Sequence, residues 1–138
     1  MSAQTMQKTN GKSNIIFFRL EANEIHQILL DIGMRPNLNG FIYIAYSLEL
    51  IRENPELLEH ITKGLYIDLA KHFRTTPSSV ERAMRHAVTV TWLRGDRLFL
   101  KHIFASIIHS ENYIPSNTVF LAGLYHYLEG DLPFGQAS

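Results

Sequence analysis

The sequence predicts an all-α domain of about six helices, and three observations support this class. Apolar residues recur at three- and four-residue spacing along most of the chain, Gly and Pro fall at the ends of these periodic segments, and no strand-rich block is present. The 138 residues are 46% hydrophobic, which is the size and content of one ordinary domain with a substantial core. We therefore expect a compact helical bundle.

The N-terminal region differs from the rest of the chain. Residues 1–14 are polar and lack apolar periodicity, so a flexible tail is expected. The apolar run IIFFRL at residues 15–20 fits either a short strand or a lead-in segment that packs on the core. We place the tail and lead-in within residues 1–20 and a single domain within residues 21–138.

Helical periodicity then predicts six segments, with stop signals at glycine or proline between them. These segments are residues 21–33, 39–52, 61–73, 78–94, 96–108 and 115–130. A brief helical turn, PELLEH at residues 55–60, separates the second from the third. Trp92 and the tyrosines at 43, 46 and 66 fall among apolar neighbours at helical spacing, so we assign them to the core.

Composition argues against several classes of protein. The chain has no cysteine, which excludes disulfides and thiol catalysis, and its seven histidines lack the spacing of metal ligands. Glycine-rich phosphate loops, nucleophile elbows and paired-carboxylate motifs are missing, so we predict neither an enzyme nor a bound metal or cofactor. No apolar run approaches the roughly 18 to 20 residues of a membrane span, and the polar start does not resemble a signal peptide. A cytoplasmic protein without membrane contact is expected.

Charge is distributed unevenly along the chain. The formal net charge is zero, which by itself argues against binding to nucleic acid. Residues 60–101, however, carry eight basic and three acidic side chains, for a net charge of +5, whereas residues 21–59 carry a net charge of −5. A basic segment of this kind attracts anions even when the whole molecule is neutral.

The basic segment contains a stretch typical of a helix that displays one polar face. On a helical projection, residues 78–91 separate into an apolar arc and a polar arc that holds Ser78, Ser79, Glu81, Arg82, Arg85, His86 and Thr89. The helix has two plausible starts: Thr76 as N-cap with Pro77 in the first turn, or Ser78 as N-cap with Glu81 closing a capping box. Either start makes residues 74–79 a short turn between two helices.

Two helices joined by a short turn match a helix-turn-helix. Arg82 and Arg85 suit this chemistry because arginine donates two parallel hydrogen bonds to guanine. Glu81 could accept from cytosine, although a capping role explains the same residue. From the pattern alone, a DNA-reading face and an ordinary solvated face are equally good interpretations.

Residues 25–97 resemble a known family. The segments ITKGLYIDLAKHF and VERAMRHA, together with the Trp-x-Arg-Gly that ends at Gly95, are similar to the C-terminal DNA-binding effector domain of the sporulation initiation response regulator, stage zero sporulation protein A. The similarity is strong to Gly95 and looser beyond it. The resemblance implies a six-helix bundle around a helix-turn-helix that binds double-stranded promoter boxes and contacts the sigma subunit of RNA polymerase. These boxes often occur as tandem copies, on which the resemblance implies a homodimer.

The resemblance also implies roles for individual residues. It places Glu81, Arg82 and Arg85 at or beside base-reading positions. It also places Lys71 and Arg74 near phosphates, and Ser78 and His86 near the DNA backbone. Thr76 is first a turn residue that could also contact a phosphate, and Ser79 lies at the edge of the reading face. The family usually has an arginine at the position of Ser79, so one cation of the reading face is missing.

Two further expectations concern the receiver domain of the family and an alternative function. Nothing in residues 1–24 could supply the phosphoacceptor receiver domain of the family, so we expect a stand-alone effector domain. The alternative function is a protein-interaction module that keeps the fold but binds a parent regulator or RNA polymerase. Zero net charge and Ser79 favour this alternative, whereas Glu81, Arg82 and Arg85 favour DNA.

Overall fold

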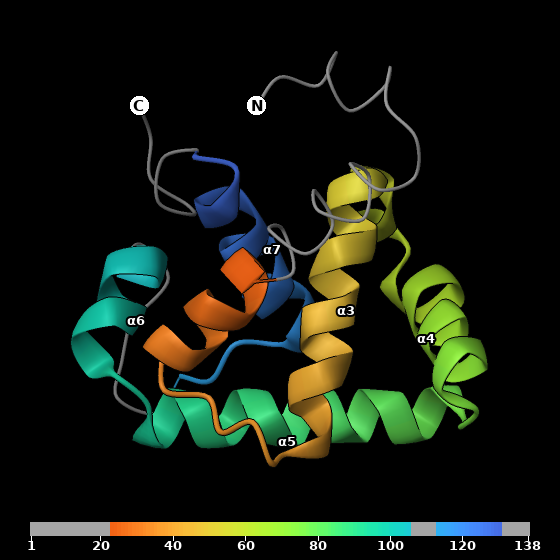
Figure 1. Cartoon of the computed structure of the whole chain (residues 1–138), viewed down its shortest axis with the longest axis horizontal. Helices are drawn as coiled ribbons and strands as arrows, with labels where there is room; N and C mark the ends of the chain where they lie inside the picture. The colour runs from red at the N-terminus through yellow and green to blue at the C-terminus, as the bar shows by residue number, and fades with distance from the viewer. Residues whose placement is uncertain (1–22, 106–112, 131–138) are drawn as a thin grey trace.

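The computed structural model describes residues 23–105 and 113–130, which form six α-helices and two short helical turns around one core (Figure 1). The elements are a helix over residues 23–31, α3 (Asn39–Glu53), the 3-10 turn η1 (Pro55–Glu59), the π-helical turn η2 (Ile61–Leu65), α4 (Tyr66–Phe73), α5 (Pro77–Arg94), α6 (Arg97–Phe104) and α7 (Asn117–Leu128). The all-α prediction is confirmed. The predicted tail, the 15–20 segment and the end of the predicted 96–108 helix lie outside the described residues.

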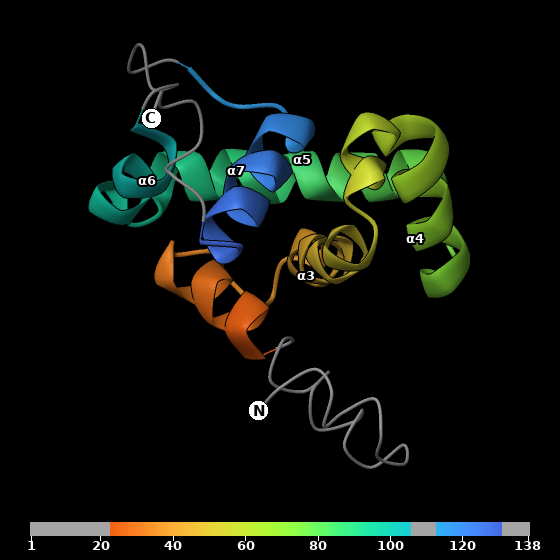
Figure 2. The same ribbon diagram turned by 90° about the horizontal axis from the view of Figure 1, so that it is seen from above.

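The longest helix, α5, runs across the foot of the bundle. Figures 1 and 2 show α3 and α7 packed on it, with α4 at one end and α6 at the other. The crossing of α3 and α5 is close because Gly40 lacks a side chain. A Cβ at Gly40 would lie 2.3 Å from the carbonyl oxygen of Ala83 and 2.6 Å from the Cβ of Ala87. This packing leaves the opposite face of α5 available to other molecules.

The core contains the apolar residues that the helical periodicity predicted. Ile25, Ile28 and Leu29 of the first helix are buried, as is Ile32 in the turn that follows, and Gly33 has a φ of +90°. Trp92 is 1% exposed and packs edge-on against Phe104, with ring centroids 5.2 Å apart, as a core residue rather than a stacking platform.

One predicted helix has a different opening turn. Residues 61–73 are not α-helical throughout, because η2 is a π-helix in which the amide of Tyr66 donates to the carbonyl of Ile61. Four apolar residues recur here at every fourth position: Ile61, Leu65 and Leu69 are buried, and Phe73 is half-buried against the core. Thr62 and Lys63 of this turn are exposed.

A single arginine joins the first helix, α3 and the end of α7. Arg52 of α3 donates through Nε to Oε2 of Glu129 at 2.8 Å and through Nη2 to the carbonyl of Leu128 at 3.2 Å. Its Nη1 forms an ion pair with Oε1 of Glu24 at 2.8 Å. Burial lowers the pKa of Arg52, but the bonds to Glu129 and Glu24 outweigh burial, so its pKa is raised. Arg52 therefore stays charged at any working pH.

No helix within the described ranges is long and apolar enough to cross a membrane.

Candidate nucleic-acid interface

A tight turn connects α4 to α5. The helix α4 ends at Phe73, and Arg74 adopts a left-handed conformation with φ 56° and ψ 51°. The amide of Thr75 then closes the turn by donating to the carbonyl of Ala70 at 2.9 Å. Within the described ranges, Arg74 is the one non-glycine residue with a positive φ, a conformation that usually selects glycine at a helix end.

Thr76 begins the next helix. Its Oγ1 accepts a hydrogen bond from the amide of Ser79 at 3.1 Å, and Pro77 occupies the first helical position. The hydroxyl of Thr76 also donates to Oγ of Ser79 at 3.0 Å. Of the two predicted starts, the structure therefore selects Thr76, and Ser78 lies inside the first turn as an exposed residue.

The two predicted arcs of α5 are both found. Val80, Met84, Ala87 and Val88 are buried against the bundle. On the other side, Ser78, Arg82, Arg85 and His86 are exposed, while Ser79, Glu81 and Thr89 are half-buried. We call these seven residues the polar face of α5. Lys71 and Arg74 are exposed at the end of α4, beside the start of this face.

Glu81 has a partner that the capping-box interpretation did not include. Its Oε2 lies 3.4 Å from Nε of Arg85, one helical turn further on, and the two side chains are 35% and 62% exposed. Exposed pairs of this kind contribute only about 0.3 to 0.5 kcal/mol. Arg85 can therefore exchange Glu81 for another anion at little cost.

A family model described as Sporulation initiation factor Spo0A C terminal matches residues 25–128. The chain belongs to this family. The match extends from the first helix to the end of α7, so it includes the region beyond Gly95 where the sequence resemblance is looser. The resemblance seen in the sequence is thereby confirmed.

Family membership shows which class of protein the chain belongs to. The Spo0A C-terminal family consists of DNA-binding effector domains, so the chain is, at the level of the family, a DNA-binding transcription regulator associated with sporulation and not a member of an enzyme family. The arrangement of α4, the turn at Arg74–Thr76 and α5 is compatible with the predicted helix-turn-helix. The nine predicted site residues all lie on the last turn of α4, on this turn or on the first three turns of α5.

The structure adds residues to this region that the sequence did not indicate. Asn117, the first residue of α7, donates through Nδ2 to the hydroxyl of Tyr66 at 2.9 Å and to the carbonyl of Glu81 at 3.3 Å. These bonds fix the N-terminus of α7 beside the polar face of α5. A cavity of about 580 Å³ lies there, lined by residues that include Arg85 and Thr118. No sequence signal could have found it, because its walls come from segments 36 and 51 residues apart.

Proposed function

We propose that this protein regulates transcription by reading promoter boxes in the major groove with the polar face of α5. The observation that carries the proposal is the exposure of Arg82 and Arg85 on a helix that begins at a tight turn, in a chain of a DNA-binding family. Each arginine is long enough to donate two hydrogen bonds to O6 and N7 of one guanine.

The other residues of this region have supporting roles. Lys71 and Arg74 stand at the entrance of the polar face, where cations contact phosphates and set the register of the protein on the duplex. Thr76 is occupied as a cap, so its contribution to DNA binding is to orient the first turn. Ser78 and His86 flank the two arginines and can donate to base edges or to phosphates.

A binding titration tests this proposal. Fluorescence anisotropy would compare a duplex that carries the family's promoter box with a scrambled duplex, at several salt concentrations. We expect Arg82→Ala and Arg85→Ala each to cost about 1 to 3 kcal/mol on the box and to reduce the preference over the scrambled duplex. Lys71→Ala should weaken both duplexes equally. Equal losses on both duplexes for all three variants would mean that the arginines contact only phosphate.

A second candidate function rests on a different observation. Leu93 and Leu98 are 61% and 81% exposed on either side of Gly95, and Arg94 and Arg97 lie beside them. Exposed apolar side chains favour a protein contact where they form one patch. We propose that this surface contacts RNA polymerase through its sigma subunit when the domain is bound at a promoter. Leu98→Asn should then reduce transcription from the box without changing the anisotropy titration.

A further inference from the structure

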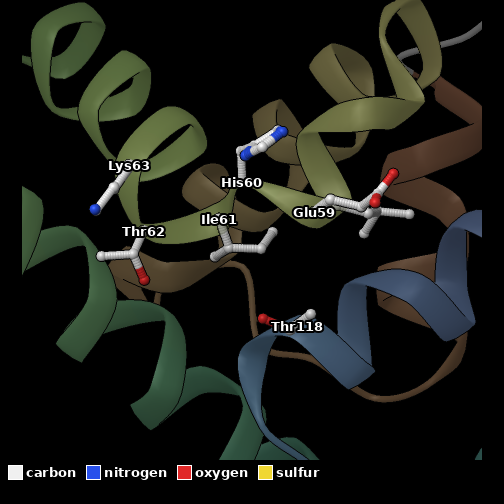
Figure 3. Close-up of a pocket in the computed structure, with 7 residues that line it drawn as sticks. Glu59, His60, Ile61, Thr62, Lys63 and Thr118 are labelled. Atoms are coloured by element: carbon white, nitrogen blue, oxygen red, sulfur yellow. The ribbon is translucent and has the colours of Figure 1, made fainter.

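Two adjoining cavities lie between η2 and the N-terminus of α7. The larger, of about 580 Å³, reaches the polar face of α5, and the smaller, of about 400 Å³, extends from it along η2. Thr62 and Thr118 line both cavities. Figure 3 shows these two side chains facing one another from η2 and α7, with Lys63 on the same side of the smaller cavity as Thr62. We call the joined cavities the η2–α7 groove.

The walls of this groove are rich in hydrogen-bond donors. The amides of Asn117 and Thr118 belong to the first turn of α7, where backbone amides have no acceptor within the helix, and the third amide of that turn is taken by Ser116. The helix has 12 residues, so its dipole adds a partial positive charge at this end. Hydroxyls of Thr62 and Thr118 complete the wall, and Lys63 and Arg85 stand at the two ends.

Tyr66 and Asn117, which are buried beneath this wall, have hydrogen-bonding groups that are still unused. Asn117 is 7% exposed, and because its Nδ2 donates to Tyr66 and to the carbonyl of Glu81, its Oδ1 has no hydrogen-bond partner. Tyr66 accepts that bond, so its own hydroxyl proton is free to be donated. Burial raises the pKa of Tyr66, which keeps the proton in place at neutral pH. Tyr66 and Asn117 both line the larger cavity.

We propose that the η2–α7 groove binds a phosphate of the DNA backbone, on the strand that passes beside the polar face of α5. Donors from the α7 amides, Thr62, Thr118 and Tyr66 surround the phosphate oxygens, and a bridging water can donate both to Asn117 Oδ1 and to the phosphate. The inference rests on the proposed function, because α5 lies in the major groove only if it reads DNA.

The position of the groove favours a DNA phosphate over a free one. Glu81, Arg85 and Thr89 line the larger cavity and also belong to the polar face of α5. The major groove is only about 12 Å wide, so a helix inside it has a phosphate backbone along each edge. Two carboxylates line the joined cavities: Glu81, whose Oε2 lies 3.4 Å from Nε of Arg85, and Glu59, which Figure 3 shows on the far side of His60 from Lys63.

The first experiment changes the charge at Thr118 without threatening the fold. Thr118 is exposed in the first turn of α7, where an aspartate interacts favourably with the helix dipole. Thr118→Asp should therefore melt no lower than wild type yet bind the promoter duplex about tenfold or more weakly at 0.15 M salt. Asparagine has nearly the shape of aspartate without its charge, so Thr118→Asn should lose only the hydroxyl contact and bind the duplex about twofold to threefold more weakly than wild type. Equal affinities of the two variants would overturn the proposal.

A second experiment identifies the phosphate. Single phosphates of the promoter duplex are replaced by neutral methylphosphonates, and each duplex is titrated with wild type and with Lys63→Gln. We expect one or two replacements to weaken DNA binding by wild type severalfold and to have a much smaller effect on binding by Lys63→Gln. Such a difference would show that the Lys63 side chain and that phosphate are energetically coupled. Absence of coupling at every position, with specific binding intact, rejects the groove but not the proposed function.

The remaining outcomes concern the source of the phosphate and the function itself. If wild type does not prefer the promoter duplex over a scrambled one, the proposed function fails before the groove is tested, and the proposal falls with it. Inorganic phosphate titrated without DNA, followed through the amide resonances of Asn117 and Thr118, distinguishes a free anion. Saturable binding at low millimolar concentration, together with no coupling to any DNA phosphate, would assign the groove to a free phosphate and overturn our inference.

Discussion

Arg74 offers a test in which stability and DNA binding change in opposite directions. Its left-handed backbone, with φ 56° and ψ 51°, costs a non-glycine residue roughly 1 to 2 kcal/mol. Arg74→Gly removes this cost, while the greater freedom of glycine in the unfolded chain takes back about 0.4 to 1 kcal/mol. We therefore expect the free energy of unfolding to rise by about 0.5 to 1 kcal/mol, which raises Tm by about 2 to 5 °C.

The same substitution removes a cation from the entrance of the polar face of α5. If Arg74 contacts a phosphate, the slope of log affinity against log salt should become shallower by about 0.9, and the affinity should fall about fivefold on box and scrambled duplexes alike. Thermal melting and an anisotropy salt series measure the two effects. A protein that is more stable but binds less well cannot be explained by misfolding.

Arg74→Ala is the matched control at the same position. Alanine also loses the cation but keeps a Cβ in the left-handed region, so this variant should bind as weakly as Arg74→Gly and melt no higher than wild type. Equal melting temperatures for the glycine and alanine variants would refute the strain argument. Wild-type affinity and salt slope in both variants would refute the phosphate contact.

Three further predictions address the reading face and the packing. Ser79→Arg should restore the family's cation at the edge of the polar face of α5. We expect a higher affinity for DNA, a slope of log affinity against log salt that is steeper by about 0.9, and an unchanged melting temperature. An unchanged slope would mean that this edge does not approach DNA. Gly40→Ala places a Cβ 2.3 Å from the carbonyl oxygen of Ala83 and should lower the free energy of unfolding in urea by about 1 to 3 kcal/mol or more. Gly64→Ala is the control, because the nearest atom to its Cβ is 3.3 Å away, and its free energy of unfolding should stay within about 1 kcal/mol of wild type. Arg52→Met should lower the free energy of unfolding by about 1 to 2 kcal/mol. This loss is smaller than for a fully buried ion pair, because the side chains of Glu24 and Glu129 are 55% and 38% exposed. An unchanged free energy of unfolding in urea would show that the packing of the three helices does not depend on Arg52.

The candidate site was largely visible in the sequence because its information is local. A polar arc at 100° per residue and a glycine behind it determine which side α5 buries and where it ends, and the threonine and proline ahead of it limit its start to two residues. The same residues carried the family resemblance, which gave the likeness to a DNA-binding domain. Individual contacts of Arg82, Arg85 and the other site residues with DNA stay predictions.

The sequence did not decide the start of α5 or the backbone of residues 61–65, because in each case two local conformations have similar energies. Thr76 and Ser78 are both good N-caps, and only the folded turn, with Arg74 in the left-handed region, places the hydroxyl of Thr76 on the amide of Ser79. Likewise, the four-residue spacing of Ile61, Leu65 and Leu69 predicted an α-helix, and the observed π-helical turn buries the same three residues. Burial pattern alone cannot distinguish these two backbones.

The sequence by itself therefore determined the helices of this protein, the polar face of α5 and its family, because each depends on residues within a few turns of one another. Tertiary structure alone decided what lies beside that face. Asn117 reaches Tyr66 and Glu81, and Arg52 reaches Glu24 and Glu129, across separations of 28 to 77 residues. Such pairs have no periodic signature, since they form only when the packing of the apolar faces brings distant helix ends together. The η2–α7 groove exists for the same reason.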